Sequence, residues 1–253
     1  MRRSLLIAAS ALVAASTAAF ALAPSPLQEP SSFAAALADP VRPAEDRARD
    51  AARHTAETLA FAQVAPGQKI TDMIMGGGYF TRVFSAAVGP QGRVTAWQPA
   101  EFIAFQASYG ESLTEVDALP NVDAIRSPIS APELPSGLDL VFTAQNYHDL
   151  HLAPFPADTA SKVNAAVFQA LKPGGLYVII DHHAAAGSDL AAADSLHRID
   201  IEAVKREVTA AGFILDGESD ILAADADPRT ANVFDDSIRG KTSQFMLRFR
   251  KPQ

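Results

Sequence analysis

Residues 69–98 read KITDMIMGGGYFTRVFSAAVGPQGRVTAWQ, in which two apolar segments flank a glycine-rich turn and an amphipathic segment. The apolar run 69–75 follows a Pro-Gly turn and predicts a buried strand. Apolar side chains then recur three and four residues apart over 80–88, as on one face of a helix. A Gly-Pro pair ends that helix, and 93–97 predicts a second strand. The stretch therefore predicts a right-handed βαβ unit in a parallel sheet.

Three consecutive glycines, Gly76, Gly77 and Gly78, stand where the first strand meets the helix. Without Cβ atoms they let a ligand approach the backbone closely, and the free N–H groups at the helix start favour polar or anionic atoms. A tight turn without a ligand would use the same residues. Because open α/β sheets bind ligands at the carboxyl ends of their strands, we expect a ligand site here.

Two motifs resemble class I S-adenosylmethionine-dependent methyltransferases. The first is D-x-x-x-G-G-G-Y-F-T from Asp72 to Thr81, and the second is LKPGG at 171–175, which precedes an apolar strand ending in Asp181. The resemblance implies an α/β fold, a Rossmann-like doubly wound sheet of about seven strands in the order 3-2-1-4-5-7-6, with an antiparallel C-terminal hairpin. It also implies S-adenosylmethionine as the cofactor.

The same resemblance implies which residues hold the cofactor. They come from the first strand, the glycine turn and the ends of the second and fourth strands: Asp72, Gly76, Gly77, Gly78, Tyr79, Gln98, Glu101 and Asn146. Two positions depart from the family pattern. Ile74 replaces the usual first glycine, and Gln98 replaces the acidic residue that usually holds the ribose hydroxyls. Glu101, three residues later, offers a substitute carboxylate.

The stretch from Asp72 to Phe249 as a whole resembles a small family of exported, predicted methyltransferases. Besides the glycine loop, the shared signatures are N-Y-H-D at 146–149, H-R-I-D at 197–200 and R-G-K-T at 239–242. The likeness implies one methyltransferase-like domain over 44–253.

The N-terminal segment has the composition of an export signal. Residues 1–21 contain Arg2-Arg3, an Ala-rich apolar stretch and the A-x-A site at 19–21, which predicts a signal peptide. Residues 22–43 are rich in Pro, Ala and Ser and predict an extended linker or a wrapped arm. Residues 44–63 predict one helix. We therefore expect a periplasmic or secreted protein without a stable membrane span once the signal is removed.

Composition limits the partners and the chemistry. The 253 residues carry a net charge of −8, and an acidic surface argues against nucleic acid as a partner. The chain has no cysteine, which excludes disulfides and thiolate metal sites. A small molecule is therefore the expected substrate.

Histidines and carboxylates follow the fourth and fifth strands, which are neighbours in the expected sheet. We expect His148, Asp149, Asp181 and His182 to converge beside the glycine turn and to be catalytic, with His148 as the general base that a carboxylate orients. A metal site from His148, His151, His182 and a carboxylate is an alternative. A further alternative is that these histidines have a structural role and form hydrogen bonds with loops or the backbone. The spacing His-x-x-His on a loop is not diagnostic, so no metal is expected.

These patterns predict an S-adenosylmethionine-dependent methyltransferase acting on a small-molecule acceptor. A physical difficulty keeps a second hypothesis open, since the methyl donor is made in the cytosol and an exported enzyme would need a supply. The alternative is an exported, non-methylating protein of the same fold that binds a ligand or a metal in the same crevice.

Overall fold

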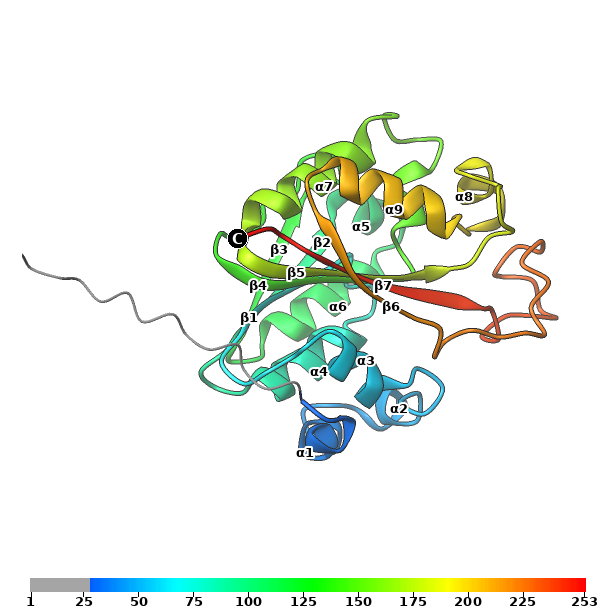
Figure 1. Cartoon of the computed structure of the whole chain (residues 1–253). Helices are drawn as coiled ribbons and strands as arrows, with labels where there is room; N and C mark the ends of the chain where they lie inside the picture. Colours follow the sequence, from blue (N-terminus) through cyan, green and yellow to red (C-terminus); the bar gives the residue numbers. More distant parts are fainter. Residues whose placement is uncertain (1–27) are drawn as a thin grey trace, which may run out of the picture.

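The computed structural model describes residues 28–253, and the predicted signal peptide lies outside the described residues. A seven-stranded sheet runs through the centre in the order β3-β2-β1-β4-β5-β7-β6, which confirms the predicted fold (Figure 1). The strands are β1 (Lys69–Met73), β2 (Arg93–Pro99), β3 (Val122–Ser127), β4 (Leu138–Ala144), β5 (Leu171–His182), β6 (Ile214–Ser219) and β7 (Gln244–Arg250).

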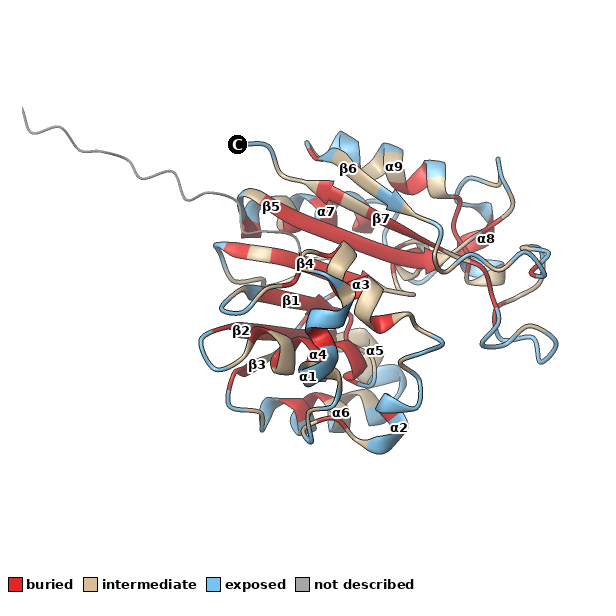
Figure 2. Cartoon of the chain, turned by 60° about the horizontal axis from the view of Figure 1, so that its bottom comes forward, coloured by how far each residue is buried: buried red, intermediate tan, exposed pale blue. Residues whose placement is uncertain are grey.

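The first five strands are parallel, and β7 pairs antiparallel with both β5 and β6. Strands β1, β4 and β5 are mostly buried, as expected of parallel strands covered on both faces (Figure 2). The first strand ends at Met73, two residues earlier than predicted, because Ile74 turns into the left-handed region at φ +59°.

Helices cover both faces of the sheet (Figure 1). On one face α7 and α9 bury apolar stripes against the core, and on the other α3, α4 and α6 do so. The helices are η1 (Pro30–Phe33), α1 (Ala34–Leu37), α2 (Ala44–Arg47), α3 (Thr55–Phe61), α4 (Tyr79–Val88), α5 (Ala100–Phe105), α6 (Ser108–Asp117), η2 (His148–His151), α7 (Thr159–Ala170), α8 (Ala191–Leu196) and α9 (Ile201–Ala210). Asp200 caps α9, since its carboxylate accepts a hydrogen bond from the Glu202 N–H.

The prediction of one helix over 44–63 is wrong, because α2 and α3 are separate. His54, before α3, has φ +45° and interrupts the helical path. Asp50, between the two helices, accepts hydrogen bonds from Arg42 and from the Tyr79 hydroxyl. The preceding arm packs on the domain, with Phe33 and Arg42 both buried.

Within residues 28–253, the helices are all too short or too polar to cross a membrane.

Candidate active site

The crevice of interest lies where the sheet order reverses, between β1 and β4. The chain leaves β1 towards β2 on one side and returns to β4 on the other, and ligands of open α/β sheets bind beside the loops at such a point. The Asn146 amide ties these two loops together by donating hydrogen bonds to the carbonyl oxygens of Ile74 at 2.9 Å and Ala144 at 2.7 Å. Asn146 therefore positions the crevice walls.

Ile74 stands in a strained backbone conformation at the corner of β1. A β-branched residue with positive φ is an outlier and costs about 1–3 kcal/mol, which the surrounding structure must offset. The side chain is 2% exposed and belongs to the core. An apolar side chain thus fills the position at which class I methyltransferases usually have a glycine.

The glycine turn is open over two of its three residues. A Cβ added to Gly76 or Gly77 would meet nothing within 4 Å, whereas one added to Gly78 would lie 2.7 Å from Val116 Cγ1. Gly76 and Gly78 also have φ of +58° and +78°, which side chains rarely adopt. Gly76 and Gly77 therefore form a bare backbone cradle, and Gly78 provides the close contact with α6.

Gln98 holds this cradle in place from the end of β2. Its Oε1 accepts the Gly76 N–H at 2.9 Å, and the side chain is fully buried. Among the described residues, no partner satisfies the buried Nε2 of Gln98. Glu101 does not replace Gln98 there, since its Oε2 accepts the Ile129 N–H at 3.0 Å. The cradle and the orphaned amide donor fit a polar ligand lying along the turn.

Asp72 lies buried beneath the turn and holds the first turn of α4. Its Oδ2 accepts a hydrogen bond from Thr81 Oγ1 at 2.6 Å. Burial raises the pKa of Asp72 to about 6, against the opposing effect of that hydrogen bond. Its carboxylate anchors the helix that begins at the glycine turn.

This raised pKa predicts how stability depends on pH. The folded state disfavours the ionised form of Asp72. The free energy of unfolding of the wild type therefore falls as Asp72 ionises, when pH rises from about 4 towards about 6. We expect the free energy of unfolding of Asp72→Asn, relative to the wild type, to rise over that interval by up to about 1.4 kcal/mol per pH unit. Urea unfolding across the interval measures it. The matched change at exposed Asp236 is the control, and equal pH profiles for both variants would contradict the assignment.

Tyr79 faces the segment between α2 and α3. Its hydroxyl donates to Asp50 Oδ1 at 2.6 Å and lies 2.5 Å from Thr55 Oγ1, and its side chain is buried. The Arg53 guanidinium lies 4.6 Å from the centre of its ring. Tyr79 therefore links the glycine turn to the segment between α2 and α3.

Arg53 lines a hollow on the α4 face of the sheet, with Phe80, Gln145 and Gln244 among the other lining residues. Burial, with a smaller effect of Arg49, lowers the pKa of Arg53 to about 10, so it stays protonated at neutral pH. No carboxylate within residues 28–253 forms an ion pair with it. The hollow is shallow, with a cavity volume of about 30 Å³, which is room for about two water molecules.

The predicted histidine–carboxylate cluster forms in part. His148 Nδ1 lies 2.8 Å from Asp181 Oδ1, and the His148 backbone N–H donates to Asp181 Oδ2 at 2.7 Å. His148 Nε2 lies 3.2 Å from Asp149 Oδ1. The structure thus brings His148, Asp149 and Asp181 together, as the neighbouring ends of β4 and β5 predict.

His182 is directed elsewhere. Its ring centre lies 6.1 Å from that of His148, and its Nδ1 is 2.8 Å from Thr242 Oγ1. Burial lowers the pKa of His182 to about 4 despite the opposing charge of Asp181, so its imidazole is neutral at physiological pH. His151 also lies apart, paired with Glu207 at 3.1 Å.

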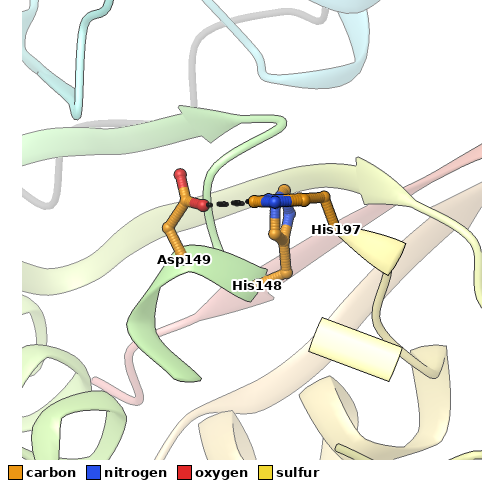
Figure 3. Close-up of side chains that lie close together, drawn as sticks. All are labelled: His148, Asp149 and His197. Carbon is orange, nitrogen blue, oxygen red and sulfur yellow. Dashed lines mark ion pairs between the residues drawn. The ribbon is translucent and has the colours of Figure 1, made fainter. Parts of the chain in front are cut away.

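The structure adds His197 to the cluster. Its Nδ1 lies 3.9 Å from Asp149 Oδ1, and its ring packs edge-on against that of His148 with 5.4 Å between centres. Figure 3 shows the Asp149 carboxylate facing the two imidazoles. The H-R-I-D signature contains His197, but only the fold of α8 against η2 places it here.

The carboxylates change what His148 can do. Burial lowers its pKa, but Asp181 and Asp149 outweigh burial and raise the pKa to about 10. Burial would raise the pKa of Asp149, but the hydrogen bond with His148 and the nearby His197 imidazole lower it below its usual range. At neutral pH His148 is therefore an imidazolium, and Asp149 is the ionised group that can accept a proton.

Several solved structures share this fold. The chain is similar to a SAM-dependent methyltransferase from Aquifex aeolicus, with 19% identity over 88% of this chain and 98% of that one and a TM-score of 0.58. It is similar to the N-methyltransferase NodS from Bradyrhizobium japonicum, at 15% identity over 83% and 99% with a TM-score of 0.55. The [4+2]-cyclase SpnF matches at 16% over 80% and 81% with a TM-score of 0.57.

The fold is that of the class I S-adenosylmethionine-dependent methyltransferases. Comparison with protein-family models gives no match, and comparison with curated proteins gives none either. The finer likeness to exported methyltransferases stays a prediction.

Proposed function

We propose that the protein transfers a methyl group from S-adenosylmethionine to a small-molecule acceptor. The observation that carries the proposal is the bare backbone cradle at Gly76 and Gly77, which opens at the point where the sheet order reverses. This cradle stands in a fold shared with methyltransferases, a likeness that by itself concerns fold alone.

Four residues would hold the cofactor. The backbone of Gly76 and Gly77 gives close approach, and the unpartnered Gln98 Nε2 offers a buried hydrogen-bond donor. Arg53, a cation without an ion-pair partner among the described residues, would neutralise the carboxylate of the methionine part. When bound, the cofactor supplies an electrophilic methyl group on a sulfonium. The ionised Asp149 carboxylate would accept the proton of the acceptor.

The acceptor is proposed to be a small molecule rather than a nucleic acid. The net charge of −8 opposes binding of a polyanion such as nucleic acid.

Calorimetry with S-adenosylmethionine and S-adenosylhomocysteine tests the proposal, with Gly77→Val as the diagnostic variant. Gly77 has ordinary φ and open space above it, so valine there is expected to leave stability within about 1 kcal/mol while filling the cradle. We expect binding to weaken at least about tenfold, which is about 1.4 kcal/mol. Gly77→Ala should give an intermediate loss. Absence of binding to the wild type, or equal binding by Gly77→Val, would refute the proposal.

A second candidate is a protein that binds a ligand on this fold without methylating anything. Ile74 fills a position that is usually glycine, and the neutral Gln98 stands where a carboxylate is usual. The similarity to a [4+2]-cyclase supports the point that this fold does not require methyl transfer. Transfer of label from methyl-labelled cofactor to a mixture of small metabolites discriminates the two, since binding without transfer would favour the second.

A further inference from the structure

The geometry points to a binding site for one divalent transition-metal ion at His148, Asp149 and His197. Each of these residues offers one ligand atom, and the three atoms lie within 4.8 Å of one another (Figure 3). The inference does not depend on methyl transfer or on cofactor binding, because all of its ligands are side chains of this chain. An ion bound here would replace the proton on His148 Nε2 and would take the Asp149 oxygen that is the proton acceptor in the metal-free protein.

The donor set suits such an ion. Two imidazole nitrogens and one carboxylate oxygen form the combination that first-row divalent metals take in sites with open coordination positions. Ligand atoms bound to one metal at about 2.0–2.1 Å lie roughly 3–3.5 Å from each other. The Asp149 oxygen is 3.2 Å from His148 Nε2 and 3.9 Å from His197 Nδ1, and all three ligand atoms lie within 4.8 Å of one another, so His197 must rotate towards the other two ligands when the ion binds.

Asp181 supplies the outer support that metal-binding histidines ordinarily have. Its carboxylate is fully buried and lies 2.8 Å from His148 Nδ1, which leaves Nε2 to face the other two ligands. The same carboxylate accepts the His148 backbone N–H at 2.7 Å and so fixes the whole residue. A carboxylate on the far nitrogen orients the ring and increases its basicity as a ligand.

His197 is held in place by an unusual backbone. It follows α8 with φ +52°, a left-handed conformation that costs about 1–3 kcal/mol for a residue other than glycine. The next residue, Arg198, is anchored in a buried ion pair with Asp227. The ring of Phe234 packs against the His197 ring at 4.9 Å between centres. The fold therefore maintains a strained backbone that turns this imidazole towards Asp149.

The three ligands also differ in exposure in a way that leaves one side open. The side chains of His148, Asp149 and His197 are 4%, 13% and 27% exposed. An ion can enter past His197, and a small molecule could complete its coordination from the same side.

Metal binding by the full chain, purified without a polyhistidine tag, tests the inference directly. We expect elemental analysis after dialysis against Zn²⁺ to give one ion per chain, and Co²⁺ loading to give visible absorption bands of a nitrogen- and oxygen-ligated ion. His197→Gln and Asp149→Asn should each weaken Zn²⁺ binding, measured by competition with a chelator, at least about tenfold. Asp181→Asn, which removes the outer support, should weaken it by about 10–100-fold.

Two matched histidine variants control for adventitious binding. His54→Gln and His151→Gln change imidazoles outside the cluster and are expected to leave the affinity and the stoichiometry unchanged. Circular dichroism checks the fold of each variant. His197→Gln changes a partly exposed residue, so it still tests metal binding if Asp149→Asn unfolds. Less than one ion per chain, or equal loss in His151→Gln and His197→Gln, overturns the inference. Calorimetry with S-adenosylmethionine is a separate measurement from metal binding, so the proposed function and the proposed metal site can each be refuted without the other.

Discussion

Replacing Arg198 with leucine is expected to lower the free energy of unfolding by about 3–5 kcal/mol. Arg198 and Asp227 are both fully buried, and their side chains meet through two hydrogen bonds of 2.8 and 2.9 Å. Leucine removes the cation and leaves the Asp227 carboxylate without its countercharge in the interior. The cost of that uncompensated charge dominates the expected loss.

The pair also organises the long connection between β6 and β7. Arg198 donates to the carbonyl oxygens of His183 and Ala231, while Asp227 accepts the backbone N–H groups of Arg229 and Ser243. One ion pair therefore fixes several points of a connection that has no helix or strand. Its loss should loosen the connection and, through the adjacent residue, the position of His197.

Urea unfolding measures this prediction, and the Arg93–Asp123 pair provides a matched control. That pair has the same chemistry but is 51% and 48% exposed, so Arg93→Leu is expected to change the free energy of unfolding far less than Arg198→Leu does. The double change Arg198→Leu with Asp227→Leu should recover much of the loss, because no charge is then left buried. Equal costs for the two single arginine variants would contradict the burial argument.

The sheet could be predicted from the sequence because its strands are covered on both faces. Largely apolar runs such as LDLVFT and LYVII have few alternatives to buried parallel strands, and the glycine turn and LKPGG set where the strands begin and end. Neighbouring strand ends then bring His148 and Asp181 together. The strand order alone is therefore enough to predict that His148 and Asp181 lie close together.

The remaining details depend on contacts between distant segments, which no local pattern reports. His197 joins the cluster because α8 folds back onto η2, whereas His182, adjacent to Asp181 in sequence, turns to Thr242. Tyr79 follows the glycine turn, but its hydroxyl is captured by Asp50 from a segment that the sequence predicts as helix. In each case a single polar contact outweighs the local preference.

Asp181→Asn is expected to lower the pKa of His148 from about 10 by roughly 1–3 units and to cost about 3–5 kcal/mol in stability. Both oxygens of Asp181 accept hydrogen bonds, from the backbone N–H groups of His148 and His182 and from the His148 ring. An asparagine amide must turn its NH₂ group towards one of these donors. The variant therefore loses a charge and gains an unfavourable contact between two donors.

In metal-free protein, the pH dependence of the free energy of unfolding shows how strongly the Asp181 charge stabilises protonated His148. The pKa of His148 is raised on folding, so its stabilising contribution is complete below about pH 6.5 and is lost as pH rises through about 10. Wild-type stability should therefore fall between these limits, and the fall should be smaller in Asp181→Asn. Ring NMR titration of His148 measures the pKa, and urea unfolding at the two ends of the interval measures the slope.

Glu207→Gln serves as the control, because Glu207 pairs with His151 at 3.1 Å and does not contact His148. It is expected to leave the His148 titration unchanged even if it lowers stability through Tyr147, whose hydroxyl donates to Glu207. A His148 pKa that stays near 10 in Asp181→Asn would show that Asp149 alone holds the proton. In that case Asp181 would be a backbone anchor, and the orientation of the His148 ring would have to come from Asp149 and the packing of His197.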